Sequence, residues 1–422
     1  MCTALILAQP PTLTVDEAIA IAVQNNHDLR VAKNNTKIAE VDASLLNSGY
    51  LPTLSAQGGI SYSNENQNVL LNDGNAANLD GAVTETYNAS VTAEYMIFDG
   101  LVRKFTQDSN EANFELAQLQ ERQQIENTII GIYEQFFQVA YQRQVVINLK
   151  RNITNSADRL DRAQRNLKYG QGTQLEVLNA QVDLSNDSIS HREALRDLKN
   201  AKRNLNLLLG REVRTDFTTD TTVVLAKPLQ ETEVIEMAEQ SNIQIILAAQ
   251  NILLSEIDLK INKAQFLPKV SGSGSYRWNE SQNPPTSFAL NTEAYGVNLG
   301  LNLSWNLFNG SNSARIKKAK IAKQTRAIEL AEVSVQLETE VLNAYETYGL
   351  AQYQVRAAQK NWETNQRNFE RTQKQYRFGQ ITAIEFRQAQ INLFNAANNA
   401  ARSRYDLKIA EINLLQLMGT LI

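Results

Sequence analysis

The chain has 422 residues and a formal net charge of −4, with 41 basic and 45 acidic side chains, so it lacks the basic excess of a nucleic-acid-binding protein. Its single cysteine excludes an intramolecular disulfide framework. Only 7 prolines and 18 glycines interrupt long stretches of Gln, Asn, Ala, Leu and Glu, a composition that favours long helices.

Residues 1–12 contain a short apolar run followed by two prolines. We expect either the remnant of a secretory signal or a plain terminus here. Lipidation at Cys2 is the less favoured alternative, because the small apolar residues of a lipoprotein signal do not precede it.

The first predicted element is a helix that runs from Thr14 to about Gly49. Thr14 and Glu17 have the spacing of a capping box at its start. Leu51-Pro52 then ends the helix, because proline disfavours the helical conformation of the residue before it.

Two strands follow in which apolar and small polar residues alternate. The alternating set is Leu54, Ala56, Gly58, Ile60 and Tyr62, then Tyr87, Ala89, Val91, Ala93 and Tyr95. Period-two alternation predicts strands with one apolar face. The Asn-rich stretch 64–84 is predicted to be the loop between them.

After Asp99-Gly100, roughly 70 residues without proline predict a long helix, with Gly131 as a possible joint. At ~1.5 Å per residue this helix would be on the order of 100 Å long. Gly170 suits the left-handed position that ends a helix, and a second helix is predicted to return to Gly210.

The chain then repeats this plan. "YGQGTQLEVLNAQVDLSN" at 169–186 matches "FGQITAIEFRQAQINLFN" at 378–395, "YLPTLS" at 50–55 matches "FLPKVS" at 266–271, and "YMIFDG" at 95–100 matches "WNLFNG" at 305–310. We therefore predict an N-terminal segment (1–12), a first repeat (13–210), a linker (211–228) and a second repeat (229–422).

In the second repeat, the strands are predicted around 270–278 and 295–305, with a loop at 281–292, and Gly349 is the second possible helix joint. Heptads mark the long helices: Val146, Ile153, Leu160 and Leu167 are seven apart, as are Val355, Trp362, Phe369 and Tyr376. This spacing predicts helices that pack side by side with a left-handed supercoil.

The strand Tyr295–Leu307 has the most apolar face: Val297, Leu299, Leu301, Leu303 and Trp305 alternate with Gly, Asn and Ser. Strands of about ten residues with one apolar and one polar face are typical of outer-membrane β-barrels, in which lipid covers one face and water the other. Because the smallest familiar barrels need eight strands, four strands require several chains, and the number stays open at this point.

The duplication, the Leu-Pro break before a strand, the "FDG" and "FNG" returns into a helix, and the two glycine-containing tips together resemble the TolC family of outer-membrane efflux channels over residues 13–419. The resemblance implies a mainly α protein with a small β part. It implies a homotrimer whose twelve-stranded barrel, four strands per chain, sits in outer-membrane lipid and continues into a periplasmic α-helical barrel. It also implies two partners, a periplasmic adaptor and an inner-membrane transporter, and no enzymatic activity.

The predicted tips contain Gly170, Thr173 and Glu176 in the first repeat and Gly379, Thr382 and Glu385 in the second. Both Thr–Glu pairs fit a capping box, which is a structural explanation by itself. The resemblance adds a function: the tips dock the adaptor and close the periplasmic aperture.

At that aperture the resemblance places Glu385, with Tyr376 in a closing network. The chain departs from the family at Gln388, where a second acid is expected, and at Ile381, where a gating arginine is expected.

Catalysis finds little support. His27 and His191 are the only histidines and lie in unrelated helical contexts, and we expect neither a cofactor nor a metal site. The alternative function is a periplasmic coiled-coil scaffold or adaptor whose strands form an ordinary sheet, which detergent-free extraction would distinguish from a membrane channel.

Overall fold

The computed structural model describes residues 11–70, 74–225 and 230–422, so the N-terminal signal and Cys2 hypotheses lie outside the described residues. The chain divides into two compact units. The first consists of residues 1–35, 118–248 and 330–422, and the second consists of 36–117 and 249–329.

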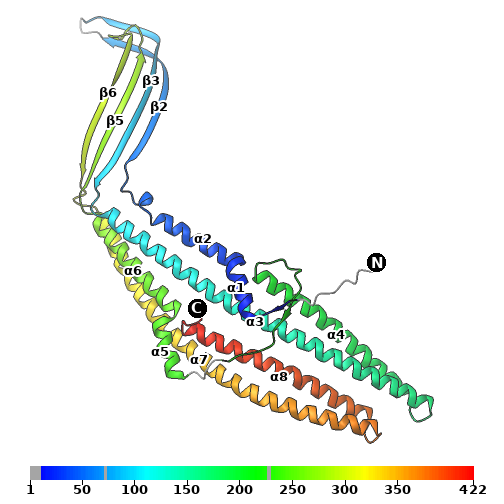
Figure 1. Cartoon of the computed structure of the whole chain (residues 1–422). Helices are drawn as coiled ribbons and strands as arrows, with labels where there is room; N and C mark the ends of the chain where they lie inside the picture. Colours follow the sequence, from blue (N-terminus) through cyan, green and yellow to red (C-terminus); the bar gives the residue numbers. More distant parts are fainter. Residues whose placement is uncertain (1–10, 71–73, 226–229) are drawn as a thin grey trace, which may run out of the picture. The chain divides into compact units, whose positions relative to one another are not determined.

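The second unit contains one four-stranded antiparallel sheet in the order β2-β3-β5-β6 (Figure 1). The strands are β2 (Thr53–Leu70), β3 (Ala76–Phe98), β5 (Lys269–Gln282) and β6 (Asn291–Ser304). The register pairs Ala56 with Val91, Val91 with Tyr276, and Tyr276 with Val297, so the alternating apolar residues of all four strands share one face.

The helices of this unit are neighbours in the same order as the strands: α2 (His27–Asp42), α3 (Val102–Lys168), α6 (Ile243–Ala264) and α7 (Gly310–Arg377). Gln107 of α3 donates to the Ala43 carbonyl after α2, Gln250 of α6 donates to the Ala112 carbonyl of α3, and Lys323 of α7 pairs with Glu256 of α6. A 3₁₀ turn (Leu45–Asn47) follows α2. Each strand pair is therefore continued by a pair of neighbouring helices.

The first unit contains two helical hairpins, α3 with α4 (Gln174–Leu208) and α7 with α8 (Ala383–Leu417). Its two largest cores lie near the far ends of α4 and α8. Phe136, Leu205 and Phe217 are at most 1% exposed in one core, and Val234, Val341 and Leu414 are at most 1% exposed in the other. The remaining elements are α1 (Val15–Asn25), α5 (Glu231–Ser241) and the short parallel pair of β1 (Thr12–Leu13) with β4 (Thr218–Thr219).

Several predicted boundaries are wrong. The helix expected from Thr14 to Gly49 starts with the predicted capping box but breaks at Asn26, which separates α1 from α2. The buried Asn26 side chain accepts from the Leu29 amide and donates to the Leu208 carbonyl, so it caps the second helix and ties it to the end of α4.

The Asn-rich loop expected at 64–84 is mostly strand, because β2 extends to Leu70 and β3 starts at Ala76, and in the second repeat β5 and β6 extend to Gln282 and back to Asn291. Backbone pairing forms this ribbon although its residues lack apolar alternation. Gly131 and Gly349 are not joints: they lie inside the unbroken helices α3 and α7.

Within the described residues, none of the helices is both long enough and apolar enough to cross a membrane.

Candidate functional site at the hairpin tips

The two hairpin tips have the same backbone geometry. Gly170 has φ of 72° and Gly379 has φ of 70°, both in the left-handed region that lacks a steric penalty only for glycine. In each turn the glycine and the next residue donate to carbonyls near the helix end: Gly170 to Leu167, and Gln171 to Asn166. This arrangement satisfies carbonyl groups that the helix leaves unpaired.

Both predicted capping boxes are present. Thr173 accepts from the Glu176 amide at 3.2 Å and donates its own amide to the Glu176 carboxylate at 3.3 Å. Thr382 and Glu385 make the same pair of bonds at 3.2 and 2.8 Å, and the Thr382 hydroxyl also donates to that carboxylate at 2.9 Å. These bonds, the one from the Thr382 backbone first, hold the pKa of Glu385 below its usual value, so this exposed carboxylate is charged.

Tyr376 contacts a different set of groups from those that the resemblance suggests. Its ring stacks on Phe386 with centroids 4.8 Å apart, and the Arg162 guanidinium of the first hairpin lies 5.0 Å from its centroid. Arg162 also donates to the Arg377 carbonyl at 2.6 Å. Burial raises the pKa of the Tyr376 hydroxyl, against the opposing effect of the nearby arginines. Tyr376 therefore joins the two hairpins of one chain.

Gln388 and Ile381, the two positions at which the chain departs from the family, have different surroundings. Gln388 is exposed and donates to Asn392 one turn along α8 at 2.8 Å. Ile381, at the position expected for an arginine, packs against a small cluster that contains Phe369 and Phe386. A latch between Tyr376 and an arginine at position 381 is thus impossible in this chain.

An ion-pair network between the hairpins was not predicted. Arg387 of α8 donates two hydrogen bonds, each 2.8 Å, to the Asp187 carboxylate of α4. Ser156 of α3 donates to the same carboxylate at 2.6 Å. Arg159 pairs with Asp183 beside it. We call Ser156, Asp187 and Arg387 the hairpin clamp.

The clamp carboxylate is stabilised in its charged form. Burial alone would raise the pKa of Asp187, but hydrogen bonds from Arg387 and Ser156 and the charges of Arg387 and Arg159 outweigh burial and lower it. The hydrogen bonds to Asp187 also raise the pKa of Arg387. Each side chain is largely buried, with 9% of Asp187 and 19% of Arg387 exposed.

A comparison of the two repeats was the sequence signal that could have revealed the clamp. Shifted by 209 residues, Asp187 corresponds to Ala396, Arg387 to Leu178 and Ser156 to Asn365. Each charge thus has no counterpart in the other repeat: Asp187 of the first repeat corresponds to an alanine, and Arg387 of the second corresponds to a leucine. A charge that replaces an apolar residue on a packed helix face needs a buried partner.

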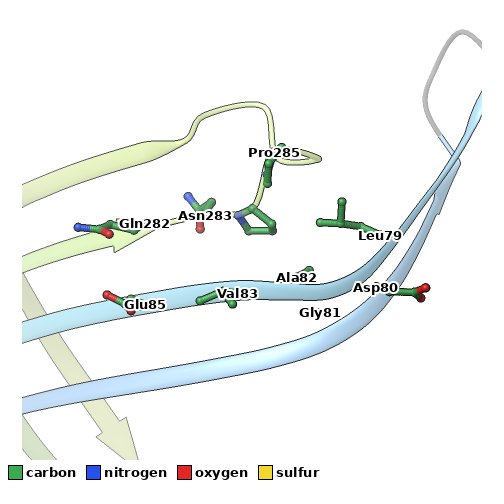
Figure 2. Close-up of a pocket in the computed structure, with 10 residues that line it drawn as sticks. Leu79, Asp80, Gly81, Ala82, Val83, Glu85, Gln282, Asn283 and Pro285 are labelled. Atoms are coloured by element: carbon green, nitrogen blue, oxygen red, sulfur yellow. The ribbon is translucent and has the colours of Figure 1, made fainter.

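A hollow of about 310 Å³ lies beside the clamp and is lined by Asp158, Arg159, Arg162, Arg165, Tyr376 and Arg377, among others. A second hollow, of about 420 Å³, lies in the sheet unit at the turn between β5 and β6 (Figure 2). Its two carboxylates, Asp80 and Glu85, lie at opposite ends of the hollow. In the described part of the chain, no group of three or more His, Cys, Asp or Glu side chains is arranged to hold a metal ion.

Comparison with known proteins relates both halves of the chain to outer membrane efflux proteins. The family model for outer membrane efflux proteins matches residues 18–211 and again 234–420. The outer membrane protein TolC of Vibrio cholerae is 22% identical over 62% of this chain, and that match spans 60% of the TolC length. The probable outer membrane lipoprotein SilC of Salmonella typhimurium is 23% identical, over 96% of this chain and 85% of SilC.

The fold also matches solved structures. The CmeC outer membrane channel of Campylobacter jejuni superposes with a TM-score of 0.79 at 14% identity, covering 100% of this chain and 91% of CmeC. At this level of identity the superposition shows that the fold is that of a TolC-like channel. The family model covers most of the sequence, so the chain belongs to the outer membrane efflux protein family, a family of channel proteins located in the outer membrane.

Proposed function

We propose that this chain forms the exit duct of a tripartite efflux or type I secretion assembly. Three copies would join their sheets into a twelve-stranded barrel in outer-membrane lipid and their hairpins into a periplasmic helical barrel. A periplasmic adaptor and an inner-membrane transporter would deliver the substrate, which then leaves passively through the duct. The names of the relatives, which include efflux pump outer membrane proteins, support this role.

The observation that carries the proposal is a sheet whose two edge strands are each unpaired on one side and whose one face is apolar. Among the described residues, β2 pairs only with β3 and β6 only with β5. The apolar face is uncovered in the single chain: Leu54 is 76% exposed, Leu299 84% and Leu301 74%. Unpaired strand edges are costly in hydrocarbon, so a membrane location requires neighbouring copies to pair with these edges.

The domain plan and the tip residues belong to the same proposal. In this proposal, residues 13–210 and 229–422 are two copies of one sequence repeat, joined by the linker 211–228 and preceded by the segment 1–12. The adaptor would dock at the tips, through Gly170, Thr173, Glu176, Gly379, Thr382 and Glu385. Glu385 and Gln388 are exposed on the first turns of α8 and would line the aperture, while Tyr376 would act from the seam between the hairpins.

A pair of neighbouring substitutions tests the barrel. Leu301 and Asn302 are adjacent on β6 and face opposite sides of the sheet. Leu301→Arg should cost ~2–4 kcal/mol if it faces the middle of the bilayer, whereas Asn302→Arg should be tolerated in a water-filled lumen. Folding yield in detergent or lipid measures both.

Equal yields for the two variants would reject the barrel. Mass measurement of the detergent-extracted protein tests the copy number: a trimer is expected, and a monomer or a hexamer would contradict it. Extraction without detergent would favour a soluble scaffold instead.

A further inference from the structure

The start of α7 carries an unusual concentration of positive charge. Between residues 315 and 326 there are six basic side chains and no acidic one: Arg315, Lys317, Lys318, Lys320, Lys323 and Arg326. Three of the six have a polar partner. Arg315 donates to Gln265 at 3.1 Å, Lys323 pairs with Glu256 at 2.5 Å, and Arg326 pairs with Glu329 at 2.7 Å.

The other three, Lys317, Lys318 and Lys320, are exposed and form no ion pair within the described chain. We call them the lysine collar. Lys317 and Lys320, three residues apart, are neighbours on one face of the helix, whereas Lys318 is rotated by about 100° from Lys317. The uncovered surface of this part of α7 is therefore positive on more than one side.

The equivalent positions of the first repeat have a different role from the lysines. Shifted by 210 residues, the collar corresponds to Gln107, Asp108 and Asn110. Gln107 and Asn110 donate to the Ala43 and Asp42 carbonyls and so hold α3 against the end of α2. The lysines at the equivalent positions of the second repeat make no such hydrogen bond in the described chain. Their ammonium groups are therefore available to a partner outside the chain.

The collar follows directly after the apolar end of the sheet. Leu307 is 76% exposed and Phe308 is 89% exposed, and the Trp305 indole, 58% exposed, donates to the Phe266 carbonyl. Exposed aromatic residues at a strand end are typical of the membrane–water interface. Since α7 begins at Gly310, the collar lies roughly 10–15 Å further along the helix.

That distance suits the phosphate layer. The polar headgroup region adds roughly 5–8 Å beyond the hydrocarbon on each side of a bilayer. A lysine side chain can extend back along a helix so that its ammonium group reaches this region. Apolar side chains followed by unpaired lysines form the sequence of groups expected where a chain leaves a membrane with anionic headgroups.

We propose that the lysine collar binds anionic phospholipid headgroups in the leaflet next to the helices. The inference rests on the proposed function, because it requires the sheet to span the membrane. The ammonium groups supply point charges and hydrogen-bond donors to the phosphate oxygens, and the exposed Leu307 and Phe308 contact the acyl chains of the same lipids.

The test uses the full chain in vesicles made of phosphatidylethanolamine and phosphatidylglycerol. Spin-labelled versions of each lipid report, by electron paramagnetic resonance, how strongly each associates with the protein surface. The expected preference for phosphatidylglycerol is about five-fold for each lysine that contacts a headgroup, which is equivalent to about 1 kcal/mol. Raising the salt concentration should reduce it.

The variant Lys317→Gln/Lys318→Gln/Lys320→Gln should lose this preference. A matched control, Lys150→Gln/Lys199→Gln/Lys360→Gln, removes the same charge from exposed helix positions of the other compact unit and should keep the preference. Equal preference in the collar variant and the wild type would overturn the inference, as would its loss in the control.

Two further outcomes separate this inference from the proposed function. If the wild type immobilises no spin-labelled lipid at all, the sheet does not span the bilayer and the proposed function fails. If lipid is immobilised without preference for phosphatidylglycerol, only the collar inference fails. If the collar variant changes the mass of the assembly and leaves lipid preference intact, the lysines contact a neighbouring copy, which also overturns the inference.

Discussion

Asp187→Asn should loosen the two hairpins from one another, because it removes the charged acceptor of three hydrogen bonds. Arg387 contributes two of these bonds and Ser156 the third. Removing one partner of a buried ion pair typically costs about 3–5 kcal/mol. Arg387 is still 19% exposed and keeps Asp183 at 3.8 Å, so we expect a smaller loss of about 2–4 kcal/mol.

Hydrogen exchange of peptides from α4 and α8 measures this loss as a fall in the free energy of local opening. The matched control is Asp161→Asn, which breaks the exposed pair with Arg165, where the two side chains are 61% and 63% exposed. A surface pair of this kind contributes at most about 0.5 kcal/mol. If both variants change exchange equally, the clamp does not hold the hairpins together.

A double-mutant cycle isolates the pair itself. Arg387→Met alone should destabilise α8 by leaving the Asp187 charge buried. The double variant Asp187→Asn/Arg387→Met should lose clearly less than the sum of the two single losses. Additive losses would contradict direct coupling between these side chains.

Three further predictions concern pH and the tips. Because the pKa of Asp187 is lower in the folded chain, the clamp should contribute fully to stability above the ordinary carboxyl pKa of 3.8 and lose this contribution as pH falls through the lower folded value. Hydrogen exchange at neutral pH and in acid measures the change. A loss of stability between pH 7 and about 5 would contradict the lowered pKa. Gly379→Val should distort the left-handed turn at a cost of ~1–2 kcal/mol and abolish cross-linking to the adaptor while the oligomer still forms. The control Gly349→Ala lies inside α7, where an added Cβ meets nothing within 4 Å, and should leave cross-linking unchanged. Normal cross-linking of the Val variant would exclude the tip as a docking site. Glu385→Gln keeps a capping side chain but removes one charge per chain, so docking should persist while single-channel conductance and cation block change; unchanged block in planar bilayers would leave Glu385 with a capping role only.

Local sequence rules worked best where one residue type determines the backbone. Gly170 and Gly379 have the predicted left-handed conformation, and Thr14, Thr173 and Thr382 begin helices with the predicted capping boxes. These features depend on a few neighbouring residues, so spacing alone identifies them. The four strands were found for the same reason, because alternation is a local pattern.

Features that depend on distant residues were missed. The break at Asn26 is stabilised by the Leu208 carbonyl, 182 residues away, and the clamp joins residues 200 apart. Extension of β2 and β3 through polar residues depends on pairing between the strands, which alternation does not report. Tyr376 was predicted to belong to a closing network at the aperture, but its contacts with Arg162 and Phe386 required the packed hairpins.

In the proposed trimer, the clamp would occur in only one of the two kinds of hairpin contact, and this would limit how the ring opens. If three copies form a ring of six hairpins, every second contact would have the Asp187–Arg387 pair, and the alternate contacts would have Leu178, Ala396 and Asn365 at the equivalent positions. The ring would then have three weak joints instead of six. The motion of lowest energy would move the two hairpins of each chain together as one rigid body. A ring of six similar hairpins would therefore widen with threefold symmetry.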